Sequence, residues 1–183
     1  MHSFHQPSHS PVVRRAQSSD VASIFGLIES MTADGTLLRR SLHEIEQQLD
    51  TFIVADSYNG EFLGCAALHR YGAHLAEVRS IAVRPEPRGL GAGGILLARL
   101  LDDIQTTGTR CACLFTRIPD FFAHYGFHTV PLASVADKMA KDCIRCPRRK
   151  RCDEIAMARG ELPAYLSGTL TDATRHLVQL QHS

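Results

Sequence analysis

A glycine-rich segment that starts at Arg88, RGLGAGG, fits two phosphate-binding motifs at once. Gly89, Gly91 and Gly94 match G-x-G-x-x-G, the loop that holds the pyrophosphate of a dinucleotide. Arg88, Gly91 and Gly93 match R-x-x-G-x-G, the loop that holds the pyrophosphate of an acyl-CoA. In both motifs, backbone N–H groups at the start of a helix bind the phosphate oxygens. The segment therefore predicts a phosphate-bearing cofactor and leaves two candidates for it.

A second concentration of reactive side chains lies in DKMAKDCIRCPRRKRCDEIAM, residues 137–157. Cys143, Cys146 and Cys152 have the spacing C-x2-C-x5-C, and a structural zinc ion needs four ligands. The candidates for a fourth ligand are His124, His128, Asp142 and Asp153. The alternative is a loop that folds over a substrate, with the cysteines as small buried side chains. We expect no bound metal, because three cysteines are a weaker signal than paired CxxC motifs.

These side chains need a scaffold, and hydrophobic periodicity with capping residues predicts one. Asp20 and the serines before it offer N-caps for a first helix, and Ser41 with Glu44 forms a capping box for a second. Ser-Tyr-Asn-Gly at 57–60 predicts a hairpin turn. The predicted strands are 12–16, 51–56, 61–71, 76–84, 111–116 and 127–130, and the predicted helices begin near 21, 41, 95 and 119. The order is β-α-α-β-β-β-α-β-α-β.

This order decides between the two glycine motifs. A dinucleotide fold places its glycine loop after the first strand, with an acidic residue about 20 residues further on. Here the loop follows the fourth strand, and the next strand ends in Thr116 and Arg117. A purely structural turn needs fewer than the four glycines in residues 89–94. The context therefore favours the acyl-CoA motif.

Composition excludes several classes of protein. The 183 residues suffice for one domain with a real core, and 44% hydrophobic with 21% charged residues is usual for a soluble globular protein. A net charge of +1 argues against nucleic-acid binding, and the basic run 148–151 is predicted to be a solvated surface. No apolar run approaches the roughly 20 residues that cross a bilayer. Residues 1–11 lack a signal peptide's apolar stretch, so we expect a cytoplasmic protein.

The order of elements, VRPEPRGLGAGG and FFAHYGF together resemble the GNAT family of acetyl-CoA-dependent N-acetyltransferases over about residues 12–130. The resemblance implies an α+β fold, with a mixed central sheet flanked by helices and acetyl-CoA as co-substrate. We expect a GNAT domain at 12–157, a disordered tail at the polar residues 1–11 and, from a weaker helical pattern, a C-terminal helical extension at 158–183. The strand before the loop would splay from the next strand, and pantetheine would lie in the gap. The implied CoA-binding residues are Ile81, Ala82, Val83, Arg88, Gly89, Leu90, Gly91, Ala92, Gly93 and Gly94.

Three further stretches resemble N-acetylglutamate synthases, in particular the short single-domain ones. They are GTLLRRSLHEIEQQLDTFIVAD at 35–56, AEVRSIAVRP at 76–85 and the cysteine segment at 137–157. The resemblance implies acetyl transfer from acetyl-CoA to the α-amino group of L-glutamate, giving N-acetylglutamate and CoA, the first step of arginine biosynthesis. The alternative is a GNAT enzyme acting on another amino acid or small amine. A different class is a non-catalytic acyl-CoA-binding or zinc-dependent regulatory module, and a homo-oligomer stays open.

Glutamate carries two carboxylates and one ammonium, so its site needs at least two cationic donors. The resemblance implies Arg40 and Lys138, and the strand pattern adds Arg79, whose charge would be costly unpaired in a central strand. Arg39 is expected to be a solvated charge. Glu77 is the best placed carboxylate to deprotonate the amine, directly or through water. The alternative for Glu77 is a surface ion pair with Arg79.

Many GNAT enzymes protonate the departing thiolate with a tyrosine. At that position in FFAHYGF this chain has Phe122, a departure that glutamate synthases share. Tyr125, three residues on, is expected to be structural. The thiolate would then leave unprotonated or take its proton from water.

Overall fold

The computed structural model describes residues 10–33, 35–85 and 91–165. These residues form two compact units. Unit 1 contains the chain up to Leu68 together with Arg79–Leu100, and unit 2 contains His69–Val78 together with the chain from Leu101. The predicted tail at 1–11 lies outside the described residues except for its last two, and most of the predicted extension at 158–183 also lies outside them.

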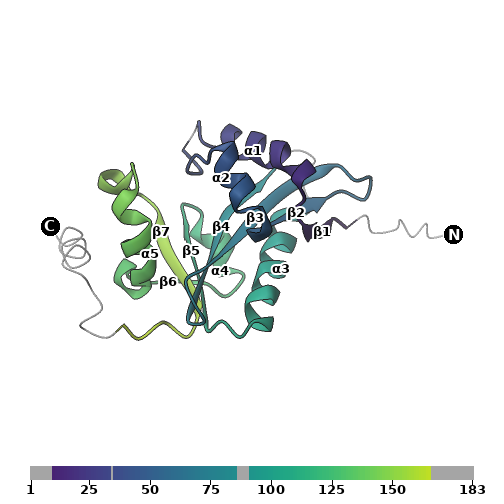
Figure 1. The fold of residues 1–183 in the computed structure, drawn as a ribbon. Helices are drawn as coiled ribbons and strands as arrows, with labels where there is room; N and C mark the ends of the chain where they lie inside the picture. Colours follow the sequence, from purple (N-terminus) through teal and green to yellow (C-terminus); the bar gives the residue numbers. More distant parts are fainter. Residues whose placement is uncertain (1–9, 34, 86–90, 166–183) are drawn as a thin grey trace. The chain divides into compact units, whose positions relative to one another are not determined.

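The strands form a mixed sheet in the order β1-β2-β3-β4-β5-β7-β6 (Figure 1). The strands are β1 Val12–Arg15, β2 Phe52–Asp56, β3 Phe62–Arg70, β4 Leu75–Val83, β5 Cys111–Thr116, β6 His128–Thr129 and β7 Ile155–Gly160. The helices are α1 Val21–Ser30, α2 Leu42–Gln47, α3 Ala92–Thr106, α4 Pro119–Ala123 and α5 Ala136–Lys141. The β4–β5 ladder is parallel, and the β1–β2, β2–β3, β5–β7 and β6–β7 ladders are antiparallel. The predicted α+β class and mixed sheet are confirmed.

Unit 1 is built as the sequence predicts. The predicted capping box forms at the start of α2, because Ser41 Oγ accepts from the Glu44 N–H and Glu44 Oε2 accepts from the Ser41 N–H. One apolar cluster joins α1, α2 and strands β2 to β4 through Ile28, Ile45 and Phe52, whose exposed fractions are 1%, 0% and 0%. Because α1 and α2 both contribute buried side chains to this cluster, both helices pack against the strands of unit 1.

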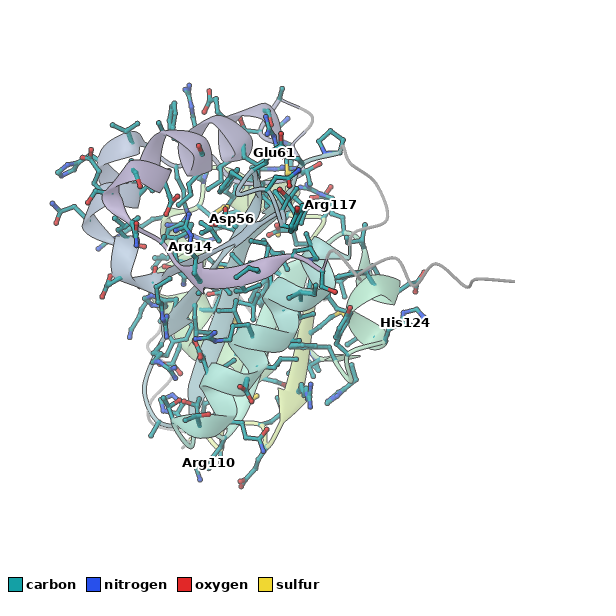
Figure 2. The ribbon with its side chains drawn as sticks, turned by 90° about the vertical axis from the view of Figure 1, so that its right-hand side faces the viewer. Arg14, Asp56, Glu61, Arg110, Arg117 and His124 are labelled. Atoms are coloured by element: carbon teal, nitrogen blue, oxygen red, sulfur yellow. The ribbon has the colours of Figure 1, made fainter. Side chains whose placement is uncertain are left out.

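Charged residues also hold unit 1 together. Arg14 Nη1 lies 2.7 Å from Asp20 Oδ2, and Arg14 Nε lies 2.7 Å from Asp56 Oδ2. Arg14 and Asp56 are labelled in Figure 2. The Arg14 guanidinium lowers the pKa of the Asp20 carboxyl below its usual value. The contact joins the strands β1 and β2 to the start of α1.

Strand β4 has an irregular backbone in unit 1. Ser80 has φ +49°, and no other non-glycine residue among those described has a positive φ. Gly64 of β3 approaches this part of β4 closely, because a Cβ on Gly64 would lie 2.5 Å from the Ala82 carbonyl oxygen. A left-handed serine inside a strand costs about 1–2 kcal/mol, so the fold holds this position against a local preference.

Unit 2 contains two elements that the sequence did not predict, α5 and β7. Strand β7 pairs with all six residues of β5, from Cys111↔Gly160 to Thr116↔Ile155. It crosses the predicted boundary at 157/158, so residues 158–160 are strand rather than part of a helical extension. Ala156 and Ala158 are buried against β5, but alanine has little strand preference, and the pattern of the sequence therefore gave no sign of a strand.

No helix among the described residues is long and apolar enough to cross a membrane.

Candidate active site

A polar network surrounds the predicted base in unit 2. Glu77 lies on β4 and is 2% exposed, and its Oε1 is 2.7 Å from the Lys138 Nζ of α5. The Tyr71 hydroxyl lies 2.7 Å from Glu77 Oε2. Asp142, which caps α5, lies 3.2 Å from Lys138 Nζ and 3.0 Å from the Tyr71 hydroxyl. Two residues that the sequence singled out, Glu77 and Lys138, are thus brought into direct contact.

The elements of unit 2 explain how these four side chains meet. Glu77 is the last residue of the three-residue ladder that pairs Leu75–Glu77 of β4 with Cys111–Cys113 of β5. Lys138 and Asp142 are four residues apart on α5 and therefore share one face of the helix. Tyr71 follows β3, and its N–H donates to the Leu75 carbonyl. Lys138 is only 15% exposed, and its ammonium compensates the charge of Glu77, whose carboxylate is largely removed from water.

A second polar cluster lies in unit 1, where Arg40 contacts β4. The Arg40 Nε donates to Ser80 Oγ at 2.8 Å, and Arg40 Nη1 donates to Gln48 Oε1 at 3.2 Å. Both acceptors are neutral oxygens that orient the guanidinium, and the Arg40 charge also contributes to lowering the pKa of the nearby Glu44 carboxyl, after the hydrogen bonds from Ser41. Arg79, the preceding residue of β4, is partly buried. Arg40 is therefore held against β4 by its hydrogen bond to the strained residue Ser80.

Arg39 behaves differently from its neighbour Arg40. Its side chain is 74% exposed, and its Nε donates to Glu29 Oε2 at 3.0 Å. An exposed ion pair of this kind contributes roughly 0–1 kcal/mol. The geometry supports the expectation that Arg39 is a solvated charge.

The described part of the glycine loop suits a phosphate group. Gly91 has φ +66°, and its carbonyl accepts from the Ile95 N–H at 3.0 Å, so it begins α3. A Cβ at Gly91 would meet nothing within 4 Å, which leaves the space beside it open. The N–H groups of the first turn, Ala92, Gly93 and Gly94, have no acceptor within an α-helix and point out of its start. Arg88, Gly89 and Leu90 lie outside the described residues.

The remaining predicted CoA-binding residues, Ile81, Ala82 and Val83, form the end of β4 in unit 1. Ala82 is 2% exposed, and its two neighbours are partly buried. They therefore belong to the strand that leads into the loop, as predicted. The contacts of each with a cofactor stay predictions.

In α4, Phe122 stands where many GNAT enzymes have the tyrosine that protonates the departing thiolate. Phe122 is 3% exposed and packs edge-on against Phe121 and Phe127. Tyr125 contacts the Phe121 ring, and its carbonyl accepts from Arg159 Nη1 at 2.9 Å. Both contacts of Tyr125 are of the kind that hold a fold together, which supports its expected structural role.

The cysteine segment forms no metal centre among the described residues, where no group of three or more His, Cys, Asp and Glu side chains could hold an ion. Of the proposed fourth ligands, Asp142 contacts Lys138, Asp153 pairs with Arg117 at 2.7 Å, and His124 Nδ1 lies 2.6 Å from the Asp120 carbonyl. Burial raises the pKa of the Cys143 thiol to about 11. Whether the three cysteines bind a metal stays a prediction.

Sequence reasoning missed Tyr71 and Ser80, and it named Asp142 only as a candidate zinc ligand. Tyr71 and Asp142 are separated by 71 residues, so their contact depends on the placement of the unpredicted helix α5. Ser80 gave no signal because serine ordinarily avoids a positive φ. Only the six-residue spacing of Tyr71 and Glu77, on either side of a tight turn, could have drawn attention to that pair.

Sequence relatives identify the family. Residues 23–127 match the model of the acetyltransferase (GNAT) family. An uncharacterized N-acetyltransferase of Chlorobaculum tepidum is 33% identical over 153 residues, which cover 84% of this chain and 98% of the relative. The chain belongs to the GNAT family. It is an acetyl-CoA-dependent N-acetyltransferase, and the role of the glycine loop in binding the cofactor stays a prediction.

Two further proteins are similar to this chain. An amino-acid acetyltransferase of Mycobacterium tuberculosis is 34% identical over 137 residues, covering 72% of this chain and 78% of the relative. A crystal structure of N-acetylglutamate synthase from Neisseria gonorrhoeae, complexed with coenzyme A and N-acetyl-glutamate, matches with a TM-score of 0.72 and 26% identity. That match covers 84% of this chain and 35% of the synthase, so this chain spans about a third of the synthase's length.

Proposed function

We propose that this enzyme transfers the acetyl group of acetyl-CoA to the α-amino group of L-glutamate, giving N-acetylglutamate and CoA. The observation that carries the proposal is Arg40, fastened to Ser80 of β4 next to Arg79. Two guanidinium groups at one strand suit an acceptor with two carboxylates, because a guanidinium binds a carboxylate through paired hydrogen bonds. The names of the Mycobacterium and Neisseria relatives support the same acceptor class.

The proposal gives each predicted site residue a role. Arg40 and Arg79 bind the carboxylates of glutamate, and Lys138 adds a third cation. Glu77 takes a proton from the α-ammonium group, directly or through water, so that the nitrogen can attack. Bound acetyl-CoA supplies the thioester carbonyl that the amine attacks.

For the cofactor, we propose that the start of α3 holds the pyrophosphate. The residues concerned are Arg88, Gly89, Leu90, Gly91, Ala92, Gly93 and Gly94. The backbone of Ile81, Ala82 and Val83 would lie along the pantetheine arm. Glycine is favoured in such a loop because a Cβ would stand between the N–H groups and the phosphate oxygens.

One observation favours the rival acceptor, an amino acid with a single carboxylate. Lys138 already contacts two carboxylates, Glu77 and Asp142, which offset its charge. If Lys138 does not bind substrate, the site has one cation fewer for an acid side chain. Glutamine, which keeps the ammonium and the α-carboxylate but lacks the second negative charge, is the sharpest competitor to test.

The test is a thiol-release assay with acetyl-CoA across the twenty amino acids, with the products identified by mass spectrometry. We expect L-glutamate to have the highest kcat/KM, above glutamine and aspartate. A highest value for glutamine would support the rival acceptor and remove the need for a second carboxylate site. Preference for an amine without any carboxylate would contradict both.

A further inference from the structure

Two carboxylates share one tyrosine hydroxyl in unit 2. The Tyr71 hydroxyl oxygen lies 2.7 Å from Glu77 Oε2 and 3.0 Å from Asp142 Oδ2. A hydroxyl has one proton and two lone pairs, so it can donate to only one of these oxygens at a time. The second contact becomes a hydrogen bond when the other carboxyl group carries a proton and donates it to the hydroxyl oxygen. The three groups are therefore arranged to share one additional, mobile proton.

The two carboxylates differ in their access to water. The Glu77 side chain is 3% exposed, whereas the Asp142 side chain is 34% exposed. Glu77 thus presents almost no surface from which a proton can leave. Asp142 can exchange protons with the solvent, and Tyr71 bridges the two.

We propose that Tyr71 and Asp142 form the route by which Glu77 discharges the proton that it takes from the acceptor amine. The inference rests on the proposed function, in which Glu77 is the base. First, an N–H bond of the ammonium breaks and an O–H bond forms on Glu77. The Glu77 proton then moves to the Tyr71 oxygen while the hydroxyl proton of Tyr71 moves to Asp142. Asp142 releases that proton to water, and Tyr71 ends unchanged.

Lys138 also touches both carboxylates, but its chemistry suits it less to this role. An ammonium group has three donors and no acceptor, so it cannot take a proton until it has lost one. A hydroxyl group can accept and donate at once. Loss of a proton from Lys138 would also remove the charge that compensates Glu77 and Asp142. Lys138 therefore holds the two carboxylates in place while Tyr71 carries the proton between them.

Other charged and titratable groups face this network and set its electrostatics. Lys141 Nζ lies 5.2 Å from the centre of the Tyr71 ring, and the His69 ring packs edge-on at 4.7 Å. Cys143 and Glu154 both interact electrostatically with Lys138 and Glu77. A phenylalanine at position 71 would keep the two ring contacts and lose only the hydroxyl.

The decisive variant is Tyr71→Phe, measured with saturating acetyl-CoA and the best acceptor amino acid. We expect kcat to fall about tenfold or more, a part of the roughly 10²–10⁴-fold that general acid–base catalysis contributes. The KM for acetyl-CoA should stay within about twofold, because the relay begins after binding. Added imidazole should not restore kcat in this variant, because loss of one buried oxygen atom leaves no room for a small base.

Asp142→Asn should show the same loss, added imidazole should restore part of kcat at this partly exposed position, and Asp142→Glu should recover part of the wild-type rate. The double variant Tyr71→Phe/Asp142→Asn should be no slower than either single one, because both interrupt one route. Tyr58→Phe, at a residue 66% exposed in the β2–β3 turn, is the matched control and should keep the wild-type kcat. If Tyr71→Phe does not fold, the two Asp142 variants carry the test.

Two outcomes would overturn the relay. One is a wild-type kcat and pH profile in Tyr71→Phe or Asp142→Asn. The other is a loss of kcat that follows a lowered melting temperature in both variants and that imidazole does not restore in Asp142→Asn. Failure of the proposed function is a separate result, since it would show as absent glutamate turnover in the wild-type enzyme.

Discussion

The two polar clusters beside β4 hold their cations in different ways. In unit 2, Lys138 lies between the carboxylates of Glu77 and Asp142 and is largely buried. In unit 1, Arg40 is oriented by the neutral oxygens of Ser80 and Gln48. Lys138 lies within 3.2 Å of both carboxylates and compensates their charge, whereas the two hydrogen bonds of Arg40 to neutral oxygens orient its guanidinium, which also acts electrostatically on Glu44. From this difference we propose that the first cluster handles the proton and that the second binds a carboxylate of the substrate.

The largest expected effect belongs to the proton-handling cluster. Glu77→Gln keeps the size of the side chain and removes the group proposed to accept the proton. We expect kcat to fall by roughly 10²–10⁴-fold, the usual contribution of a general base. Steady-state kinetics at saturating acetyl-CoA measure this.

Binding of acetyl-CoA by Glu77→Gln, followed by calorimetry, serves as the control and should stay unchanged. A variant that retains more than half of the wild-type kcat would remove Glu77 from the mechanism. In that case Glu77 would be only the structural partner of Lys138.

Arg40→Ala tests the carboxylate-recognition cluster and should have the next largest effect. Removing one partner of a buried charged pair costs about 2–5 kcal/mol, so kcat/KM for glutamate should fall roughly 30-fold or more. The KM for acetyl-CoA should hardly change. Arg39→Ala, at the adjacent but exposed arginine, is the matched control and should lose little. Equal losses in the two variants would contradict the assignment of recognition to Arg40.

Features that depend on interactions between residues close in sequence could be predicted, and features that depend on contacts between distant elements could not. The capping box of Ser41 and Glu44 and the hairpin turn at 57–60 are local, and both form as predicted. Helix α5 and strand β7 are stabilised by contacts with distant elements, and β7 is rich in alanine, so their sequences show no clear period. The Tyr71–Asp142 contact depends on α5 and was missed for the same reason.

The candidate site shows the same pattern. Glu77, Lys138 and Arg40 could be named from residue type and resemblance, because their chemistry is specific. Their partners could not, because a tyrosine or serine has many structural roles. The left-handed backbone of Ser80 is imposed by the surrounding sheet, against the preference of serine itself.

Ser80 provides the smallest but most specific test of the comparison, because Ser80→Gly and Ser80→Ala both remove the hydroxyl that holds Arg40. Each should raise the KM for glutamate by about two- to tenfold, as expected for one hydrogen bond worth about 0.5–1.5 kcal/mol. Their stabilities should differ, because alanine at φ +49° keeps a strain of about 1–2 kcal/mol that glycine does not have. Denaturant unfolding should therefore show Ser80→Gly more stable than Ser80→Ala by about 1 kcal/mol, the reverse of the usual order in a strand. Equal stabilities would mean that β4 carries no strain at Ser80, and an unchanged KM in both variants would mean that Arg40 needs no anchor to recognise its substrate.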